Sequence, residues 1–465
     1  MNKDVDIAII GTGTAGMVAY KEVRKHTDSI ALIEGDQYGT TCARVGCMPS
    51  KLLIAAAEAS YNIEKASEFG IEVENKKIDG KLVMKRVKDE RDRFVSFVIE
   101  DIQSYKQEHL YKSKAKFKSS HCIELENGDL INAKVIILAV GSRANIPEIF
   151  QNNGKRVITS DDVFYWNDLP KSVAVIGSGI IGLEIGQALS RLGVKTKIFS
   201  RSEIIAGIHD PQLQESAREI FAEELDLELS SKITGINETE DSIKVSYENK
   251  NSVSFEESFE YLLVSAGRKS NLDSLDLDKS GLKLNEKQKP SSNPETCQCD
   301  DSHIFMAGDA AGYIPLLHEA TDEGKIAAKN AIKFLNQEKL EKHKRRSKIS
   351  IVFSDPQIMS IGASYKELQD SGLNYEFGEV NFKDQGRARS FSVNKGLLRV
   401  YGENGTKKLL GAEMIGPSAE HLAHLLAWSH QSGLTIEDLL ARPYYHPTIE
   451  EGLRTALVDL VKKLV

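Results

Sequence analysis

The sequence predicts an α/β chain in which two similar strand–turn–helix domains precede a third domain of α+β type. Apolar runs at residues 7–10 and 173–176 each enter a glycine-rich turn, and a helical pattern leaves each turn. Farther along, alternating hairpin patterns and a final helical stretch follow. The chain of 465 residues is too long for one hydrophobic core, so several domains of about 100 to 200 residues are expected.

The first turn carries Gly11, Gly13 and Gly16, which have the spacing of a dinucleotide-binding fingerprint. Glycines there allow a tight turn, close approach of the backbone to a pyrophosphate and close helix–sheet packing, with the phosphates at the helix N-terminus. A second strand at residues 29–33 ends at Glu34, about 20 residues past the glycines, where a carboxylate accepts hydrogen bonds from a ribose. A purely structural turn is the competing interpretation of one such fingerprint.

A second turn repeats this spacing at Gly177, Gly179 and Gly182. The helix after it is expected to end at Gly193, because glycine is a common C-terminal cap. Since strand and helix patterns flank both turns, we expect two Rossmann-like folds that bind two dinucleotides.

Two of the five cysteines, Cys42 and Cys47, stand just before a helical pattern at residues 52–60. A thiol at a helix N-terminus lies at the positive end of the helix dipole, which stabilises its thiolate, and Cys47 occupies this position. A zinc half-site is the competing interpretation. However, the spacing to Cys297 and Cys299 is arbitrary and no paired histidines follow, so no metal is expected.

Composition limits the remaining function classes. Hydrophobic residues make up 41% and charged residues 28% of the chain, as in an ordinary globular protein. The net charge of -8 gives no electrostatic footprint for nucleic acid, and the longest apolar runs have the length of a strand, so no membrane span is expected. Few, unevenly spread cysteines and the lack of a secretory signal pattern indicate a cytoplasmic protein.

The later segments have other patterns. Residues 242–256 alternate around an Asn-Lys-Asn turn and predict a hairpin, and a second hairpin is expected around Asn404 and Gly405. Helical spacing returns from Ser418 onward. A basic run at residues 342–348 could serve as a nucleic-acid patch, but in an acidic chain we interpret it as a solvated linker at a domain boundary.

Several blocks of sequence together resemble a known family over nearly the whole chain. Besides both glycine fingerprints, they are Gly39-Thr-Thr-Cys-Ala-Arg-Val-Gly-Cys-Met-Pro-Ser-Lys51, residues 136–142 with Gly141, Leu183-Glu184, residues 266–271 with Gly267, residues 304–309 ending at Asp309, and His446-Pro-Thr-Ile-Glu-Glu451. The family is that of the pyridine nucleotide-disulfide oxidoreductases, and the lipoamide-specific dihydrolipoamide dehydrogenases within it are the most similar. The resemblance implies an enzyme with FAD and NAD(P) as cofactors.

The resemblance also implies a domain order and an assembly. Residues 1–148 are the first part of an FAD-binding domain that residues 271–344 complete. Residues 149–270 are the NAD(P)-binding domain, and residues 345–465 are an interface domain through which two chains form a homodimer. No nucleic acid or membrane partner is implied, and a lipoyl domain of a multienzyme complex is a possible partner.

Roles are implied for the cysteine block. Cys47 is the thiol that lies against the flavin, and Cys42 is the thiol that exchanges with the substrate disulfide. Lys51 lies near the flavin N5 and pairs with Glu184 of the nicotinamide domain.

Roles are also implied outside that block. Asp309 binds the ribityl chain and Glu34 the ribose of FAD, while His446, oriented by Glu451, is the general acid–base in the partner's active site. The chemistry agrees, because thiol–disulfide exchange moves one proton for each thiolate formed or quenched. A histidine titrates near neutrality, and a carboxylate five residues later can fix its tautomer.

The block departs from the family pattern at two places. Thr40 replaces a usual glycine, and Arg44 stands where asparagine is common. A cation near the cysteines would lower a thiol pKa or attract an anionic substrate, or Arg44 is an ordinary surface residue, and both interpretations stay open. The Met-Pro-Ser-Lys51 segment favours lipoamide over glutathione disulfide as substrate. Alternatives are an NADPH-dependent reductase of another small disulfide and a non-catalytic flavin redox sensor.

The nucleotide preference depends on the end of the strand at residues 196–199. Ser200 stands at the offset that Glu34 has in the first unit, and Arg201 follows it. An acidic residue there would repel a 2′-phosphate, whereas Ser200 and Arg201 can bind one, which predicts NADPH. Gly182 favours NAD, because NADP-dependent members of the family often have alanine there.

Overall fold

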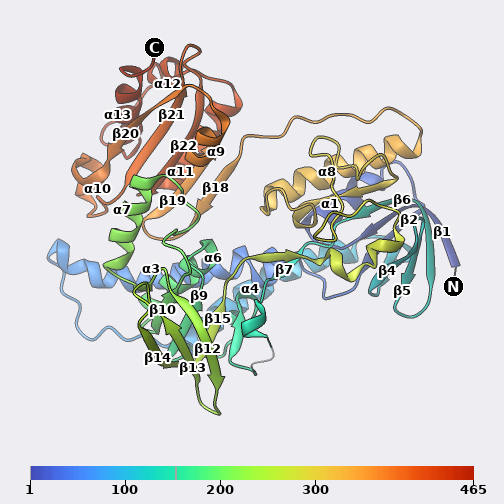
Figure 1. Ribbon diagram of the computed structural model, residues 1–465, viewed down its shortest axis with the longest axis horizontal. Helices are drawn as coiled ribbons and strands as arrows, with labels where there is room; N and C mark the ends of the chain where they lie inside the picture. Colours follow the sequence, from blue (N-terminus) through green and yellow to red (C-terminus); the bar gives the residue numbers. More distant parts are fainter. Residues whose placement is uncertain (1, 152–153) are drawn as a thin grey trace. The chain divides into compact units, whose positions relative to one another are not determined.

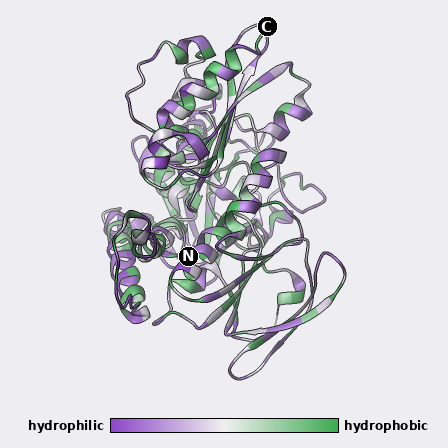
Figure 2. Cartoon of the chain, turned by 90° about the vertical axis from the view of Figure 1, so that its left-hand side faces the viewer, coloured by the Kyte–Doolittle hydropathy of each residue, from purple (hydrophilic) through white to green (hydrophobic). Residues whose placement is uncertain are grey.

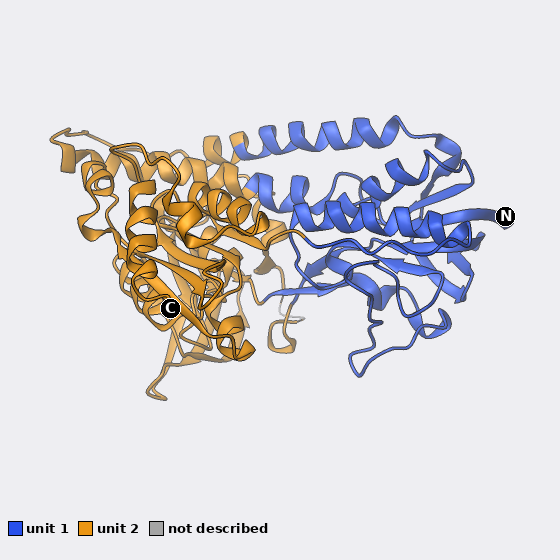
Figure 3. Ribbon diagram, turned by 90° about the horizontal axis from the view of Figure 1, so that it is seen from above, with its two compact units in different colours: residues 1–49, 87–145, 267–345 blue, residues 50–86, 146–266, 346–465 orange. Residues whose placement is uncertain are grey.

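The computed structural model describes residues 2–151 and 154–465, which form two compact units (Figure 1; Figure 3). Unit 1 comprises residues 1–49, 87–145 and 267–345, and unit 2 comprises residues 50–86, 146–266 and 346–465. Two of the boundaries fall within the long helices α3, Cys47–Lys65, and α4, Gly80–Gln103.

Unit 1 is built on a sheet with the strand order β3-β2-β1-β6-β5-β4, in which β17 also pairs with β6. Strands β1, β2, β3, β6 and β17 are parallel, and β4 and β5 extend the sheet antiparallel. The elements are β1 (Asn2–Ile10), α1 (Thr14–Val23), β2 (Ile30–Glu34), α2 (Thr41–Val45), β3 (Leu110–Lys112), β4 (Ala115–Ser119), β5 (Cys122–Leu125), β6 (Leu130–Leu138), β7 (Ser142–Ala144), β16 (Arg268–Ser270), β17 (Ile304–Met306) and α8 (Leu317–Leu335).

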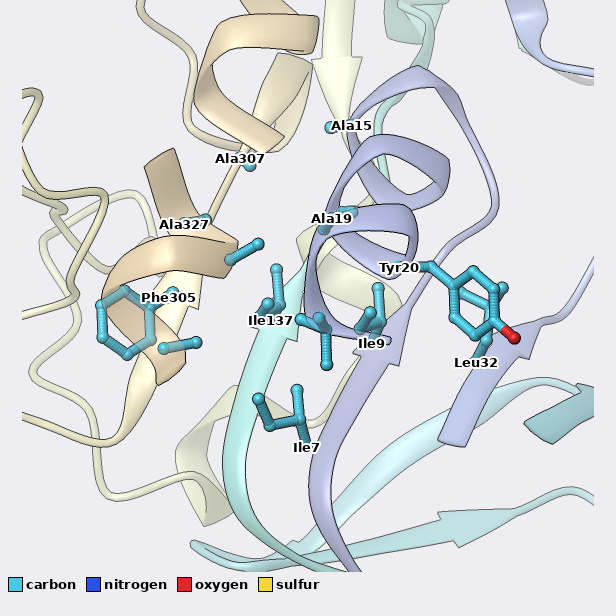
Figure 4. Close-up of a cluster of buried hydrophobic side chains, with 14 of the residues drawn as sticks. Ile7, Ile9, Ala15, Ala19, Tyr20, Leu32, Ile137, Phe305, Ala307 and Ala327 are labelled. Atoms are coloured by element: carbon cyan, nitrogen blue, oxygen red, sulfur yellow. The ribbon is translucent and has the colours of Figure 1, made fainter. Parts of the chain in front are cut away.

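The core of unit 1 lies on both faces of this sheet. Because side chains alternate along a strand, Ile7 and Ile9 of β1 face one side, where they meet α1 and Ile137 of β6 (Figure 4). Ala8 and Ile10 face the other side. The strands are buried on both faces, as expected for a parallel sheet. This packing fixes the carboxyl end of β1, where the first glycine turn begins.

Unit 2 contains a second parallel sheet with the order β11-β10-β9-β15-β8 and an antiparallel sheet of β12, β13 and β14. The hairpin predicted at residues 242–256 is confirmed by the pairing of β13 with β14. The elements are β8 (Val157–Thr159), α5 (Ser160–Val163), β9 (Ser172–Ile176), α6 (Ile180–Arg191), β10 (Lys195–Phe199), α7 (Pro211–Ala222), β11 (Asp226–Glu228), β12 (Lys232–Glu238), β13 (Ile243–Glu248), β14 (Ser254–Phe259) and β15 (Tyr261–Val264).

The C-terminal part of unit 2 is an antiparallel sheet with the order β18-β19-β22-β21-β20, packed against α11 and α13. The hairpin predicted around Asn404 and Gly405 is confirmed by the pairing of β21 with β22. The elements are β18 (Ile349–Val352), β19 (Gln357–Gly362), α9 (Tyr365–Ser371), β20 (Tyr375–Asn381), α10 (Gly386–Ser390), β21 (Leu397–Glu403), β22 (Leu409–Gly416), α11 (Ala419–Gln431), α12 (Ile436–Leu440) and α13 (Glu450–Val461).

Hydropathy follows this architecture. Hydrophobic and hydrophilic segments alternate along the helices in Figure 2, as expected for helices with one buried face. Among the described residues, no helix combines the length and apolar character needed to cross a membrane.

The basic run is not solvated throughout, because the side chain of His343 is only 21% exposed and that of Arg345 is also partly buried. Arg345 is largely buried, with its side chain 23% exposed, and forms ion pairs with Glu319 and Glu323 of α8. Both carboxylates are almost fully buried, so they need a cation from another segment. The expectation of a wholly solvated linker is therefore wrong at His343 and Arg345, while Lys344 between them is exposed.

Candidate functional site

The first glycine turn follows β1 directly. Gly11 has φ +108°, and its N–H donates to the carbonyl of Ile33 over 2.7 Å, which fixes the turn against β2. A Cβ at Gly16 would lie 1.9 Å from the carbonyl oxygen of Gly11, so only glycine fits this close contact. A Cβ at Gly13 would meet no atom within 4 Å, so the turn is open on that side, where the backbone N–H groups of α1 begin. This arrangement fits a pyrophosphate at a helix N-terminus.

Glu34 lies beside this turn. Its Oε2 accepts hydrogen bonds from the backbone N–H of Thr12 over 2.9 Å and from the Thr12 hydroxyl over 2.6 Å. Its Oε1 accepts from the N–H of Asp36 over 2.8 Å. The carboxylate is thus fixed next to the glycines, where a ribose of a dinucleotide would be bound. Thr12 was not predicted, although its position between two glycines of the fingerprint was a signal.

Asp309 lies in a single 3₁₀ turn, Gly308–Ala310, after β17. Its Oδ2 accepts a hydrogen bond of 2.6 Å from the Ser142 hydroxyl, which in turn accepts from Nε of Arg268 over 2.8 Å. Gly141 and Gly267, predicted as cofactor-binding residues, have φ +65° and +91° and would meet nothing within 4 Å with an added Cβ. Ser142 was not predicted as the partner of Asp309.

The two cysteines lie on consecutive helices. Cys42 is half-buried in the short α2, whereas Cys47 is exposed and is the first residue of α3. The positive end of the 19-residue α3 therefore lies at Cys47, where it favours a thiolate. Burial raises the pKa of both Cys297 and Cys299 to about 12, so these two thiols lack the properties of reactive groups.

Arg44 lies between the cysteines on α2. One of its terminal nitrogens donates to Oε1 of Gln37 over 3.0 Å, and its Nε is buried without a hydrogen-bond partner. This contact ties the side chain to the loop before α2. It supports neither of the two open interpretations of Arg44 over the other.

Lys51 lies one turn into α3 and is brought to Glu184 of α6. Nζ of Lys51 donates to Oε2 of Glu184 over 2.7 Å. Oε1 of Glu184 accepts from the backbone N–H of Phe353 over 2.8 Å, and the Phe353 ring centroid lies 4.5 Å from Nζ of Lys51. The carboxylate is buried and the ammonium partly exposed, so Glu184 is satisfied and holds the cation in place. Phe353 was missed, because no local pattern marks it.

His446 and Glu451 form the second pair of titratable groups. Nδ1 of His446 lies 3.0 and 3.1 Å from the two carboxylate oxygens of Glu451, so Nε2 remains available for proton transfer. The imidazole is 81% exposed. Hydrogen bonds from His446 and from the N–H of Thr448 hold the pKa of Glu451 below its usual value. A charged carboxylate thus orients a solvent-facing imidazole.

The second glycine turn repeats the first. Gly177 has φ +113°, and its N–H donates to the carbonyl of Phe199 over 2.8 Å. A Cβ at Gly182 would lie 1.9 Å from the carbonyl oxygen of Gly177, whereas a Cβ at Gly179 would meet nothing within 4 Å. The helix α6 ends at Arg191, and Gly193 with φ +82° follows two residues later.

Ser200 occupies the place that Glu34 has in the first unit. Phe199 pairs with Ile176, just as Ile33 pairs with Ile10, so the next residue on each strand has the same register. The Ser200 hydroxyl lies 2.9 Å from the hydroxyl of Ser178. Ser200 is buried, whereas Arg201 is exposed. The structure thus places a hydroxyl and a neighbouring cation where the first turn has a carboxylate.

Comparisons with known proteins agree with this geometry. Residues 5–324 match the model of the pyridine nucleotide-disulphide oxidoreductases, and residues 349–457 match the dimerisation domain of the same family. The dihydrolipoyl dehydrogenase of Geobacillus stearothermophilus is 27% identical over 462 residues, which covers 96% of this chain and 94% of the relative. That of Bacillus subtilis is 26% identical and covers 98% of both chains.

Solved structures show the same fold. LpdA from Mycobacterium tuberculosis has a TM-score of 0.82 at 20% identity and covers 98% of this chain and 100% of its own. The HOCl-induced flavoprotein disulfide reductase RclA from Escherichia coli has a TM-score of 0.80 at 20% identity, with 98% and 99% covered. The predicted fold class, the enzyme class and the pair of cofactors, FAD and NAD(P), are confirmed at the level of the family. The chain belongs to the pyridine nucleotide-disulphide oxidoreductase family.

Proposed function

We propose that this chain is a dihydrolipoyl dehydrogenase-like enzyme, which transfers electrons between NAD(P)H, FAD, the pair Cys42 and Cys47, and lipoamide or a related small disulfide. The observation that carries the proposal is the position of Cys47 as the first residue of α3, with Lys51 bound to Glu184 one turn later. The relatives match this chain over nearly their whole length and are named dihydrolipoyl dehydrogenases, which favours lipoamide as the substrate.

Each cofactor has a set of residues suited to hold it. FAD would supply a carrier that accepts two electrons from the nicotinamide and passes them to the Cys42–Cys47 disulfide, which is thereby reduced to two thiols. The turn Gly11, Gly13 and Gly16 would bind its pyrophosphate, and Glu34 and Asp309 would bind its hydroxyl groups. Gly141 and Gly267, where an added Cβ would meet open space, would allow close approach of the backbone. Lys51 would keep a positive charge at the redox centre, where Glu184 orients it.

The cysteines and His446 carry the exchange with the substrate. The Cys42 thiolate attacks one sulfur of the substrate disulfide, forms a mixed disulfide and releases a thiolate that takes a proton from His446. The Cys47 thiolate then attacks the sulfur of Cys42, which closes the Cys42–Cys47 disulfide and releases the second substrate thiolate. Two protein thiols are oxidised and one substrate disulfide is reduced. Glu451 holds Nδ1 of His446 throughout, so Nε2 delivers the protons.

The proposed enzyme is a homodimer with composite sites. The match of residues 349–457 to the family's dimerisation domain supports the dimer. His446 lies in this domain, and its exposed imidazole would serve the cysteines of the other chain. We place the enzyme in the cytoplasm and regard a lipoyl domain as its macromolecular substrate, in line with the names of the relatives.

For the nucleotide, we propose that NADPH is used at least as well as NADH. Ser200 and Arg201 support this preference, because no carboxylate stands where Glu34 stands in the first unit. In the family pattern, Gly182 favours NAD, because the NADP-dependent members often have alanine there. Glycine and alanine differ by one methyl group, whereas a carboxylate facing a phosphate changes the affinity more strongly. The same observation favours, as second candidate, an NADPH-dependent reductase of another small disulfide.

Steady-state turnover tests the proposal. Purified protein loaded with FAD is assayed with NADH and NADPH against lipoamide and glutathione disulfide. Lipoamide should be the better substrate, and Cys42→Ser should abolish its reduction while the protein keeps its FAD. Cys122→Ser, at a half-buried thiol outside the two helices, is the matched control and should retain activity. Reduction of lipoamide by Cys42→Ser at the wild-type rate would disprove the assignment, and preferred turnover of glutathione disulfide would favour the second candidate.

A further inference from the structure

The loop between β10 and α7, residues 201–209, contains Arg201 and is bound to the second glycine turn at residues 204 and 206. The Ser178 hydroxyl donates to the carbonyl of Ile204 over 2.7 Å, and the N–H of Ala206 donates to the carbonyl of Ser178 over 2.8 Å. Ser178 lies between Gly177 and Gly179 of the turn. The position of this loop is therefore coupled to the position of the turn that would bind the nucleotide phosphates.

The middle of the loop is held by one buried side chain of α7. Nε2 of Gln214 donates to the carbonyls of Ile205 and Ile208 over 3.0 and 2.7 Å, and Oε1 accepts from the N–H of Ile205 over 3.2 Å. Gln214 is 6% exposed and Ile205 is fully buried. The loop thus takes its conformation from α7.

The loop is followed by Asp210, which is fully buried and caps α7. Its Oδ1 accepts from the N–H groups of Gln212 and Leu213 over 3.0 and 3.1 Å. Its Oδ2 accepts from Nη1 of Arg399, on β21 of the C-terminal sheet, over 2.7 Å. A buried carboxylate without a cation would be costly, so Asp210 depends on Arg399.

Arg399 is itself buried and held by the C-terminal sheet. It is 6% exposed, and its Nε and Nη2 donate to Oε2 of Glu379 over 3.1 and 2.9 Å. The buried Tyr401 hydroxyl, 3.4 Å from Asp210, donates to Glu413 over 2.9 Å. The network has polar partners on every side, so the C-terminal sheet fixes Asp210 at a defined place.

We propose that Arg399 is a positioning residue for the pyridine nucleotide: through Asp210 it holds the loop that begins at Arg201 in the conformation that binds the adenosine ribose and its 2′-phosphate. This rests on the proposed function, since it assumes that the second glycine turn binds NADP(H). The C-terminal sheet, which lies in the segment that matches the family's dimerisation domain, would thereby influence the affinity for the nucleotide. A preformed loop spares the nucleotide the cost of ordering it.

The test separates this role from loss of folding. Removing Arg399 alone would leave Asp210 charged and buried, so the main variant is the double substitution Arg399→Met with Asp210→Asn. Asn also caps helices, and Met keeps the apolar stem, so the protein should fold and keep its FAD. The matched control is Lys395→Gln, which removes an exposed ion pair between the same domain and Glu223 at the other end of α7.

Three readouts are measured on the FAD-loaded protein: the Kd for NADP+ by calorimetry, the KM for lipoamide, and hydrogen exchange of residues 204–208. The double variant should bind NADP+ about tenfold more weakly, by about 1.4 kcal/mol, and exchange this loop faster, with the KM for lipoamide unchanged. Lys395→Gln should match the wild type. An unchanged Kd in the folded double variant overturns the positioning role. Wild-type protein that binds neither NADP+ nor NAD+ overturns the proposed function as well.

Discussion

The contact between His446 and Glu451 is local, and its chemistry can be tested at single residues. Since Nδ1 of His446 faces the carboxylate, Nε2 is the atom that would transfer protons in the proposed reaction. We expect His446→Gln to lower kcat for lipoamide by about 10²- to 10⁴-fold, the usual contribution of a general acid–base. Glu451→Gln should lower kcat less than His446→Gln does, because the imidazole remains. His26→Gln, at an exposed histidine of unit 1, is the control. Equal rates for His446→Gln and His26→Gln would contradict the assignment.

The pH dependence of this contact follows from the lowered pKa of Glu451. Hydrogen bonds from His446 and Thr448 favour the charged carboxylate of Glu451 in the folded protein. The stabilisation that these hydrogen bonds provide is therefore fully present above the ordinary carboxyl pKa. It is lost as the pH falls through the lowered pKa. The ratio of wild-type to Glu451→Gln activity should therefore stay constant above about pH 5, where the carboxylate is charged, and fall in more acidic solution. A ratio that falls between neutral pH and that limit would contradict this sign.

At the scale of elements, the proposed preference for NADPH depends on the residues that follow β10. Arg201 is exposed next to Ser200, where it can pair with a 2′-phosphate, so Arg201→Ala should raise the KM for NADPH by about tenfold and leave that for NADH unchanged. Ser200→Asp should reverse the preference, because a carboxylate there repels the phosphate. Lys195→Ala, at the exposed start of the same strand, is the control. A strong NADH preference that Arg201→Ala does not change would show that the family pattern at Gly182 prevails.

Helix α8 depends on a cation from the linker. Glu319 and Glu323 are buried and share Arg345, and Oε2 of Glu323 also accepts from the N–H of Gly308 over 2.7 Å, next to Asp309. Arg345→Ala should lower the free energy of unfolding of unit 1 by about 3 kcal/mol, because two carboxylates are left buried without a cation. Urea unfolding and the release of FAD measure this loss. The exposed Lys344→Ala is the control, and an equal effect of both substitutions would refute the role of the ion pairs.

The same cluster of Glu319, Glu323 and Arg345 predicts how the stability of the folded protein changes with pH. Burial raises the pKa of Glu323 above its usual value, so the folded protein binds this proton more tightly than the unfolded chain. Stability therefore falls as the pH rises through the raised pKa. The loss in Arg345→Ala should accordingly be smaller in acidic than in alkaline solution, because a protonated Glu323 needs no cation.

These elements also show which features a sequence can predict. Both glycine turns and the register of Ser200 followed from local spacing, because a strand, a tight turn and a helix are encoded within about 30 residues. The approach of Glu451 to His446 was local in the same way. Phe353 and Arg399 were not predicted, since their partners Glu184 and Asp210 lie 169 and 189 residues away and only packing brings them together. Arg345 was not predicted either, although its partners lie only 22 and 26 residues before it. The sequence around a basic residue in such a run does not indicate that the residue pairs with a buried carboxylate.

At the scale of the whole molecule, the proposed redox cysteines and the proposed acid–base histidine belong to different units. Cys42 and Cys47 lie in unit 1 and His446 in unit 2, within the segment that matches the family's dimerisation domain. In the proposed homodimer each active site takes its cysteines from one chain and its histidine from the other. Symmetry then gives two equivalent sites for each dimer.

Hybrid dimers test this arrangement. Cys42→Ser and His446→Ala chains are each inactive alone, but a hybrid of the two contains one site with both substitutions and one intact site. Equal mixing with random exchange makes half of the dimers hybrids with one intact site each, so about a quarter of the wild-type activity should return. A mixture of Cys42→Ser and Cys47→Ser is the matched control, because every site of its hybrids carries a damaged cysteine pair, and it should stay inactive. If each chain contained a complete site of its own, neither mixture would recover activity, even where native mass spectrometry shows that hybrids have formed.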